Sequence, residues 1–361
     1  MQNSSQGSKC GLRCVRRYRW LTLLVLPLLL LGGVTAWVAL RYGRAYWASN
    51  TAFDEASWIV LIEPGTPFDS VAVQLQQEGV IRDAGQFKRF CRVRNFDQKC
   101  YGGRYEVRRG TTTRALANMI ASHRQAAVRL VVPSVRTREE MAGRLAHQLW
   151  LDSSVLAKAL WDSTLAARYG FTVEEFPAMV VPNTYEVYWD VTLEKLFDRL
   201  HREWEAFWTS GRRERLERTG LTEAEVTTLA SIVQEEVRYK DEMPRVAGVY
   251  INRLRANMPL QACPTIKYAL GDFTLQRILF VHTQVESPYN TYIHLGLPPG
   301  PIAFPEITAV DAVLNYETHD YLYFCAKDDF SGRHNFSRTG EQHMRYARQY
   351  QRTLNRRGIG L

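Results

Sequence analysis

The sequence of 361 residues predicts an α+β protein with a single N-terminal transmembrane helix. Three observations predict this fold class. An uncharged apolar run comes first, strand-like runs followed by helical patterns occupy residues 58 to about 150, and a mostly helical region follows. We expect the last two regions to be separate domains, a small α+β module and a larger mixed α+β domain.

The apolar run Trp20–Leu40 contains no charged residue and is long enough to cross a bilayer core of about 30 Å as a helix. A cleaved signal peptide would have a shorter apolar stretch, followed by a small-x-small cleavage site. Arg41 and Tyr42 follow here instead, which favours an uncleaved anchor. Five basic residues precede the run and two follow it, so we expect residues 1–19 to form a cytoplasmic tail and residues after about 45 to lie outside.

The basic charge belongs mainly to the N-terminal region. Seven of the 46 Lys and Arg residues precede the first acidic residue, Asp54, so 39 basic residues and 37 acidic ones lie from Asp54 onward. A nucleic-acid binder is expected to carry a basic surface on its folded part, so this balance argues against a nucleic-acid partner. The 46% of hydrophobic residues argues against disorder.

Residues 58–150 repeat an apolar strand, a polar turn with threonine and an amphipathic helix. Thr66 is expected to cap a helix that starts at Pro67, and Thr137 with Glu140 forms a capping-box pattern. The three predicted strand and helix pairs are 58–62 with 67–78, 105–108 with 113–122, and 128–132 with 137–149. Cys91 and Cys100 are close enough in sequence to close a small loop, but spacing alone leaves a disulfide open.

A mostly helical, aromatic-rich stretch is expected from residue 153 to about residue 216. It is interrupted by residues 180–189, in which Asn183, Thr184, Tyr185 and Glu186 follow a proline. These residues fit a polar loop that faces a cleft, whereas aromatic residues at this density also fit a core.

The helix Thr222–Val237 is the most informative element. Thr222 and Glu225 form a capping box at its start. At 100° per residue, one face collects an apolar stripe made of Val226, Leu229, Ala230, Ile232, Val233 and Val237. Glu235 projects nearly opposite this stripe, whereas Glu236 lies on its flank and must point at protein or a cleft.

A partly desolvated carboxyl at Glu236 would have a raised pKa and could give a proton to a leaving oxygen near neutral pH. The alternative for such a glutamate is an ion pair with an arginine, for which Arg245 and Arg253 are candidates. Asp241 and Glu242 follow the helix and are expected to be solvated.

Several motifs in order carry a family resemblance. They are Leu229-Ala-Ser-Ile-Val-Gln-Glu-Glu236, Arg245–Leu254, Met258–Thr265, Ser287–Tyr292, Gly296–Ile302, Tyr321–Phe324 and His334–Phe336. Together they resemble the MltG (YceG-like) family of membrane-anchored endolytic murein transglycosylases. The resemblance extends from the anchor to about residue 345.

The resemblance implies a LysM-like module at residues 55–150 and a catalytic domain at residues 151–361. It implies cleavage of the bond between N-acetylmuramic acid and N-acetylglucosamine within nascent glycan strands, leaving 1,6-anhydro ends and terminating strand growth. Glu236 would be the catalytic acid and base, with no metal or other cofactor. The implied partners are peptidoglycan glycan strands and peptidoglycan synthases, and the implied location is the cytoplasmic (inner) membrane with the catalytic domain outside.

The matched motifs also imply substrate-binding side chains. These are Asn252, Gln261, Tyr289, Asn290, Tyr292 and His334. Gly296 and Gly300 are expected to serve backbone geometry. The sequence departs from the family pattern twice, with Gln234 where many members have glutamate and Cys263 where the family usually has aspartate.

Other chemistries find little support in the sequence. It contains no His-Glu-x-x-His, Cys-x-x-Cys or Gly-x-Ser-x-Gly motif, which argues against zinc and serine-hydrolase sites. The main alternative is a non-catalytic peptidoglycan-binding scaffold of the cell-wall synthesis machinery. A second alternative is a hydrolase that uses water and leaves reducing muramic acid ends.

Overall fold

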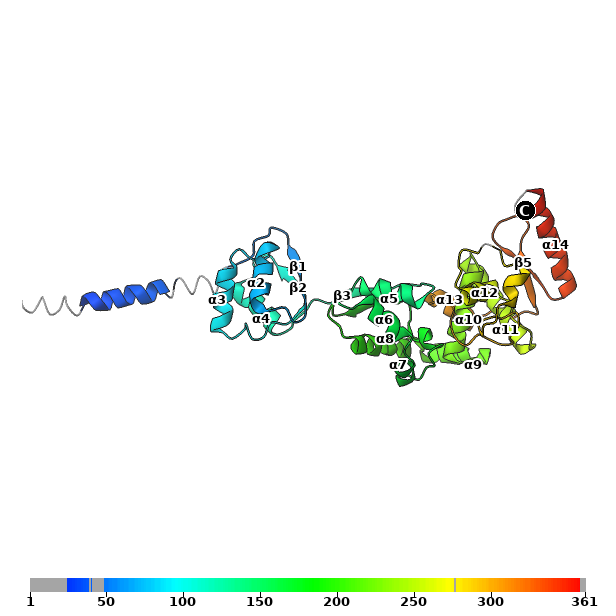
Figure 1. The fold of residues 1–361 in the computed structure, drawn as a ribbon, viewed down its shortest axis with the longest axis horizontal. Helices are drawn as coiled ribbons and strands as arrows, with labels where there is room; N and C mark the ends of the chain where they lie inside the picture. Colours follow the sequence, from blue (N-terminus) through cyan, green and yellow to red (C-terminus); the bar gives the residue numbers. More distant parts are fainter. Residues whose placement is uncertain (1–24, 39, 41–48, 276, 358–361) are drawn as a thin grey trace, which may run out of the picture. The chain divides into compact units, whose positions relative to one another are not determined.

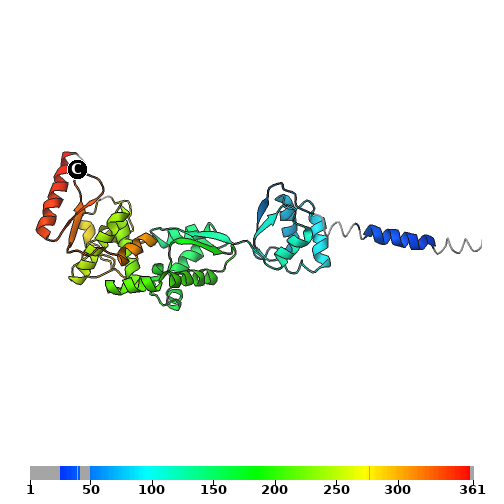
Figure 2. The same ribbon diagram turned by 180° about the vertical axis from the view of Figure 1, so that it is seen from behind.

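The computed structural model describes residues 25–38, 40, 49–275 and 277–357 (Figures 1 and 2). The chain divides into two compact units, unit 1 at Met1–Ala126 and unit 2 at Ala127–Leu361. The architecture is mixed α+β and mostly helical, and the described strands form two-stranded antiparallel sheets. This confirms the predicted α+β class.

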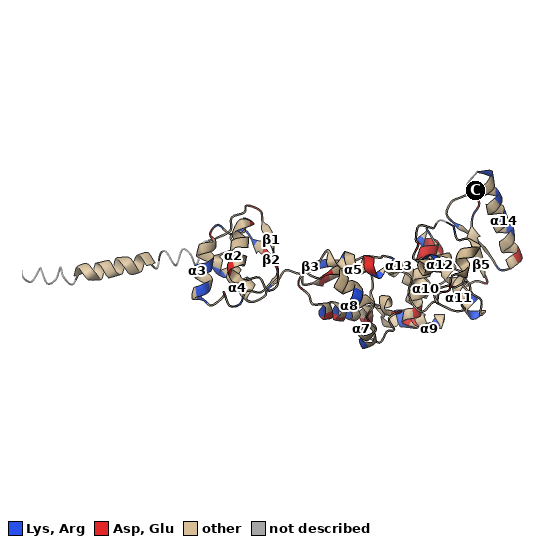
Figure 3. Ribbon diagram, viewed as in Figure 1, with Lys and Arg blue, Asp and Glu red and all other residues tan. Residues whose placement is uncertain are grey.

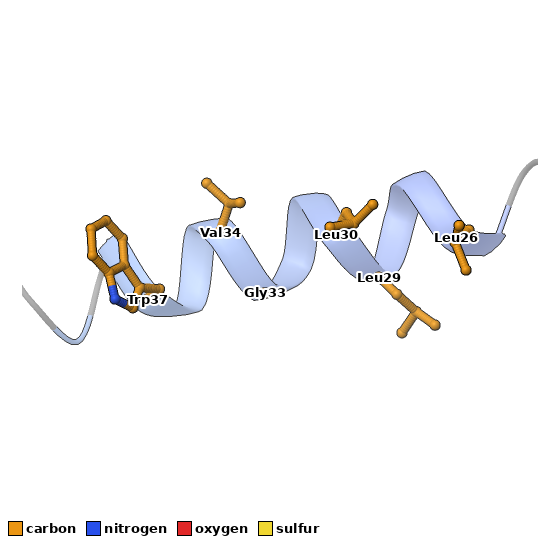
Figure 4. A pocket seen from close by; sticks show the side chains of 6 residues that line it. All are labelled: Leu26, Leu29, Leu30, Gly33, Val34 and Trp37. Carbon is orange, nitrogen blue, oxygen red and sulfur yellow. The ribbon is translucent and has the colours of Figure 1, made fainter.

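Residues 25–38 form a helix with exposed side chains, and Figure 4 shows five of these side chains around Gly33. The rest of the predicted membrane span lies largely outside the described residues, as does the predicted tail at 1–19. Among the described residues, no helix has both the length and the apolar character needed to cross a membrane.

Unit 1 folds around one sheet and three helices. Its elements are β1 (Ser57–Ile62), α2 (Phe68–Gln77), α3 (Ala84–Val93), β2 (Gly103–Arg108) and α4 (Thr113–Ala121). Strands β1 and β2 pair antiparallel, with Ser57 opposite Arg108 and Ile62 opposite Gly103. Apolar residues of both strands and all three helices form one core.

The predicted strands and the helix at 113–122 are confirmed in unit 1, with two corrections. Pro67 occupies the N-cap position of α2, and Thr66 does not cap it, because the first helical hydrogen bonds run to the Pro67 carbonyl. Helix α3 was not predicted, and Asp83 caps it by accepting from Gln86 N at 2.9 Å.

Cys91 and Cys100 are free thiols that line the same small apolar cavity in unit 1. Burial raises the pKa of Cys91 to about 12 and that of Cys100 to about 11. Both thiols are therefore protonated at neutral pH.

The boundary between the units differs from the predicted division at residue 150. Strand β3 (Val128–Val132) pairs antiparallel with β4 (Asn183–Val187), so the third strand and helix pair packs in unit 2. The polar loop expected at residues 183–186 is therefore a strand. Tyr185 is buried on its inner side, and its hydroxyl donates to Val181 O at 2.5 Å.

The first part of unit 2 surrounds the β3–β4 sheet. Its other elements are α5 (Arg138–Ala146), α6 (Ser153–Leu160), α7 (Ser163–Arg168), η1 (Phe176–Met179) and α8 (Leu193–Phe207). The predicted cap of α5 is present, since Thr137 accepts from Glu140 N at 3.0 Å. Apolar residues of these elements form one core cluster.

The second part of unit 2 surrounds a buried helix. Its elements are α9 (Ser210–Thr219), α10 (Glu223–Glu236), η2 (Lys240–Glu242), α11 (Met243–Arg255), α12 (Cys263–Leu270), η3 (Phe280–Gln284), α13 (Ile307–Leu314), β5 (Tyr323–Ala326), β6 (His334–Ser337) and α14 (Gly340–Arg356). Helix α10 contacts α11, α12 and α13, and the central position of α10 among them can be followed in Figure 1.

Candidate active site around Glu236

Both ends of α10 are well defined. The predicted capping box is present, with Glu225 N donating to Thr222 Oγ1 at 3.2 Å and Thr222 N donating to the Glu225 carboxylate at 2.7 Å. Glu236 is the last helical residue, and Val237 adopts extended backbone. The helix therefore ends at Glu236, and the next residue, Val237, is still part of the core.

The predicted apolar stripe of α10 is buried throughout. Thr227, Thr228 and Ser231 are buried as well, so the helix is covered more widely than one stripe. The two threonine hydroxyls donate to carbonyl oxygens four residues earlier, and Ser231 Oγ accepts from Ile302 N at 3.0 Å. Because these hydroxyls form hydrogen bonds inside the protein, polar residues can occupy the buried faces of α10.

The two residues before Glu236 have polar partners. Gln234 donates to Ser134 Oγ at 3.0 Å and accepts from Glu306 N at 2.7 Å. Glu235 accepts from Arg136 Nε at 2.8 Å, and its side chain is 20% exposed. Glu235 is therefore half-buried and paired, and it does not project freely into solvent.

Glu236 has no such partner. Within the described part of the chain, its carboxyl accepts no hydrogen bond and forms no ion pair within 4.0 Å. Burial raises its pKa to about 7, and the positive charges of Lys267 and Arg253 oppose this rise without cancelling it. Glu236 can therefore hold a proton near neutral pH and also release it.

Neither arginine proposed as an ion-pair partner forms that pair. Arg245 Nε lies 2.9 Å from the Glu317 carboxylate. Arg253 is buried, and its guanidinium donates to Leu322 O at 2.6 Å and to Leu260 O at 2.8 Å. The ion-pair alternative for Glu236 is therefore wrong.

Cys263 and Tyr292 lie within electrostatic range of Glu236. Cys263 Sγ and the Tyr292 hydroxyl are 3.3 Å apart. Burial is the main cause of the raised pKa of each group, and the negative charge of Glu236 adds to it. A neutral thiol and a neutral phenol therefore lie near the carboxyl of Glu236.

Gln261 belongs to the turn between α11 and α12. It has a positive φ of 51°, and its backbone N–H donates to Thr291 O at 2.9 Å. Its side chain is exposed and accepts a long hydrogen bond from Arg253 Nη1 at 3.5 Å. The amide group of Gln261 is thus accessible beside the residues that surround Glu236.

The structure corrects the predicted role of Asn290. This residue is fully buried, and its Nδ2 donates to Thr283 O at 3.0 Å and to Val285 O at 2.8 Å. Its Oδ1 accepts from Tyr292 N at 2.9 Å. Since all these groups are used within the chain, Asn290 shapes the loop that carries Tyr292 and offers no amide to a sugar.

Asn252 is half-buried, and its binding role stays a prediction. Its Nδ2 donates to His319 O at 2.7 Å and to Tyr321 O at 3.1 Å. The amide therefore fastens the segment before β5 to helix α11.

Tyr289 lies beside Tyr268, and His334 lies beside Glu242. The Tyr289 ring is 4.7 Å from the Tyr268 ring, and burial raises the pKa of its hydroxyl. His334 Nδ1 lies 3.1 Å from the Glu242 carboxylate. No described contact joins either residue to Glu236, so their binding roles stay predictions.

The expectation that Glu242 is solvated is wrong. Glu242 is only 5% exposed, and both its oxygens face the backbone and ring of His334. Asp241 is exposed as expected and pairs with Arg333 at 2.8 Å.

Two cations lie near Glu236, Arg253 and Lys267. The sequence named Arg253 only as a candidate ion-pair partner, and Lys267 was not predicted. Arg253 lies seven residues after Val246 and three after Tyr250, so it extends the buried face of α11, and a basic residue at such a position is a usable signal. Lys267 lies one turn after Cys263 on α12, and nothing in its local sequence marks it.

The described residues contain no group of three or more His, Cys, Asp or Glu side chains that could hold a metal ion. The arrangement around Glu236 therefore consists of one carboxyl with a raised pKa, two cations, a thiol and a phenol. This set defines a candidate acid–base site built on a single carboxyl.

Comparisons with known proteins identify the family of the chain. The model of the YceG-like family matches residues 60–349, and the chain belongs to this family. The chain is 25% identical over 341 residues to the endolytic murein transglycosylase of Bacillus subtilis, covering 89% of this chain and 91% of the relative.

It is also 26% identical over 320 residues to the endolytic murein transglycosylase of Streptococcus pneumoniae, covering 79% of this chain and 56% of the relative. The chain thus spans about half of that streptococcal protein. A crystal structure of a putative yceG-like protein from Listeria monocytogenes superposes with a TM-score of 0.54 at 26% identity, covering 81% of this chain and 99% of the other.

Proposed function

We propose that the chain is an endolytic lytic transglycosylase that cleaves peptidoglycan glycan strands and uses Glu236 as its only catalytic carboxyl. The observation that carries the proposal is the unpartnered carboxyl at the end of α10, whose pKa is raised to about 7. The names of the bacillary and streptococcal relatives support the same activity.

In the first step, protonated Glu236 gives its proton to the oxygen that joins N-acetylmuramic acid to N-acetylglucosamine. The bond from this oxygen to the anomeric carbon breaks, and N-acetylglucosamine leaves with a free hydroxyl. Glu236 is then a carboxylate, and the nearby positive charges of Lys267 and Arg253 stabilise it.

In the second step, the carboxylate takes the proton of the muramic acid C6 hydroxyl while that oxygen attacks the anomeric carbon. A 1,6-anhydro ring closes, and Glu236 is again protonated. No water is consumed, so the second carboxylate that ordinary glycosidases need is not required. The other acidic residues near the end of α10 suit this scheme, since Glu235, Asp241 and Glu242 are each paired with a basic side chain.

The proposal also includes the features that rest on sequence alone. Residues 20–40 would anchor the chain in the cytoplasmic membrane, and the catalytic domain would lie outside it. The module before residue 127 would be LysM-like, cleavage would terminate growing strands, and synthases would be partners. The uncharged run and the flanking basic residues support the anchor.

The test is analysis of reaction products by mass spectrometry. The purified full-length chain is incubated with peptidoglycan beside Glu236→Gln, which keeps the shape but cannot exchange the proton, and beside Glu235→Gln as a matched control. We expect internal fragments with anhydro-muramic ends from the wild type and the control, and none from Glu236→Gln. Binding without products from any of the three proteins would favour the scaffold alternative.

A further inference from the structure

A second concave surface lies in unit 2, between the end of β4 and helix α8. Its volume is about 560 Å³. Helix α8 carries both basic and acidic residues (Figure 3). The surface is lined by Ala127, Glu186, Val187, Tyr188, Val191, Lys195, Asp198, Arg199 and Arg202. We call this surface the α8 groove. None of these residues is used by the site around Glu236.

Helix α8 presents a row of cations to the groove. Leu196, Phe197 and Leu200 face the core of unit 2. Lys195, Arg199 and Arg202 recur at intervals of four and three residues, which places them along one side of the helix. Helix α8 therefore packs against the core with one face, and its row of cations lines the groove.

Two of these cations have no acidic partner. Lys195 and Arg202 are exposed, and neither lies within 4.0 Å of a carboxylate in the part of the chain that the structure describes. Arg199 pairs with Glu203 at 2.6 Å, yet its Nε is buried without a hydrogen-bond partner.

The two acidic residues of the groove do not neutralise this edge. The Asp198 carboxylate accepts from the Tyr169 hydroxyl at 2.7 Å and lies 3.7 Å from Arg168, outside the row of cations. Glu186 is exposed on β4, and no described ion pair within 4.0 Å joins it to Lys195, Arg199 or Arg202. The groove therefore keeps free positive charge and an unused buried donor.

The lining of the groove also includes apolar and aromatic residues. Tyr188 is 55% exposed, and Val187 and Val191 flank it along the chain. A concave surface with an aromatic residue in its lining and a few convergent donors is typical of a binding site for a small polar ligand. Arginine and lysine donors at such a surface favour a carboxylate.

We propose that the α8 groove binds a carboxylate of a peptidoglycan stem peptide, an inference that rests on the proposed function. The sugars of the glycan strand offer hydroxyl and N-acetyl groups, whereas the stem peptides on muramic acid carry free carboxylates. Charge complementarity therefore assigns the groove to the stem. Binding of the stem carboxylate would favour strands that still carry peptides. It would hold these strands at a place separate from the cleavage site at Glu236.

The test compares two substrates and two double variants of the full-length chain. The substrates are soluble glycan chains with stem peptides and stripped chains, from which an amidase has removed the peptides and in which the lactyl carboxylates left behind have been converted to methylamides. The variant Lys195→Gln with Arg202→Gln removes both free cations of the groove. The control, Arg348→Gln with Arg352→Gln, removes two exposed cations one turn apart on α14.

We expect the groove variant to bind peptide-bearing chains about tenfold more weakly than the wild type, with unchanged binding and cleavage of stripped chains. The control variant should match the wild type on both substrates. Equal affinity of groove variant and wild type for peptide-bearing chains would overturn the proposal, as would equal loss on both substrates. Absence of cleavage by any protein would count against the proposed function, whereas the binding comparison would still decide the groove.

Discussion

The protonation state of Glu236 is the residue-scale feature on which the proposed chemistry depends. The first step needs the protonated acid, and the pKa of about 7 means that this form declines as pH rises through neutrality. Activity should therefore fall on the alkaline side with an apparent pKa near this value.

Lys267→Met should move this alkaline limb upward by a few tenths to about one pH unit, because it removes the larger of the two positive influences that lower the Glu236 pKa. Lys267→Arg keeps the charge and is the control. The measurement is the pH dependence of kcat/KM. A downward shift in Lys267→Met, or an equal shift in both variants, would contradict the electrostatic explanation.

Glu236→Gln should stabilise the protein at alkaline pH although it abolishes activity. The folded-state pKa of Glu236 lies above the ordinary value of 4.5, so the folded state binds the proton more tightly than the unfolded state. The free energy of unfolding of the wild type therefore falls as pH rises from about 4.5 to about 7, whereas neutral glutamine is unaffected.

The stability advantage of Glu236→Gln should be small at pH 5 and roughly 1–3 kcal/mol at pH 8, at about 1.36 kcal/mol per pKa unit and discounted for partial exposure. Urea unfolding at the two pH values measures it. An advantage that is constant or shrinks with pH would show that Glu236 is not held protonated.

At the scale of elements, patterns that are local in sequence predicted more than those that depend on packing. The capping box at Thr222 and Glu225 and the strand Val128–Val132 appear as predicted, because their signals lie within a few residues. Strand β4 was missed because its partner β3 lies about fifty residues earlier, and its Asn183 and Thr184 resemble a loop.

The candidate site likewise has features that local sequence predicts and features that depend on packing. The flank position of Glu236 followed from helix periodicity, and its raised pKa agrees with that prediction. The burial of Asn290 was not predicted, because its amide satisfies backbone carbonyls that only the folded chain brings near, and the binding role of Asn252 stays a prediction. Arg253 was predicted only as an ion-pair partner of Glu236, because the carbonyl that it contacts, Leu322 O, lies in a distant segment.

Gly300→Ala tests a close approach between two segments of the chain, and it should destabilise the protein. A Cβ at Gly300 would overlap the Glu174 carbonyl oxygen, so the backbone must shift. We expect a loss of about 1–3 kcal/mol in the free energy of unfolding. In the matched control Gly143→Ala on α5, the new Cβ meets nothing within 4 Å, and a gain of about 0.5–1 kcal/mol is expected. Denaturant unfolding that ranks the two variants in the opposite order would refute the close approach.

At the scale of the whole molecule, the two units have separate cores. The core of unit 1 includes Phe87, which is 1% exposed, and the two core clusters of unit 2 contain none of its residues. Sequence patterning alone did not find this division, because the strand and helix repeat continues past residue 126 into unit 2.

Phe87→Ala should therefore destabilise unit 1 by about 3–5 kcal/mol and leave the unfolding of unit 2 unchanged. Calorimetry of the full chain should show one transition shifted and one in place, with cleavage of soluble glycan retained. Leu229→Ala, in the α10 core, should shift the other transition. A joint shift of both transitions by Phe87→Ala would mean that the units unfold as one.

The most direct test of the central claim, that one carboxyl suffices because the muramic acid C6 hydroxyl replaces water, is cleavage in H2¹⁸O. The products of the wild-type protein are analysed by mass spectrometry for isotope at the newly formed muramic acid ends. We predict 1,6-anhydro ends that contain no ¹⁸O. Reducing muramic acid ends labelled with ¹⁸O would show that water is the nucleophile and would contradict the account.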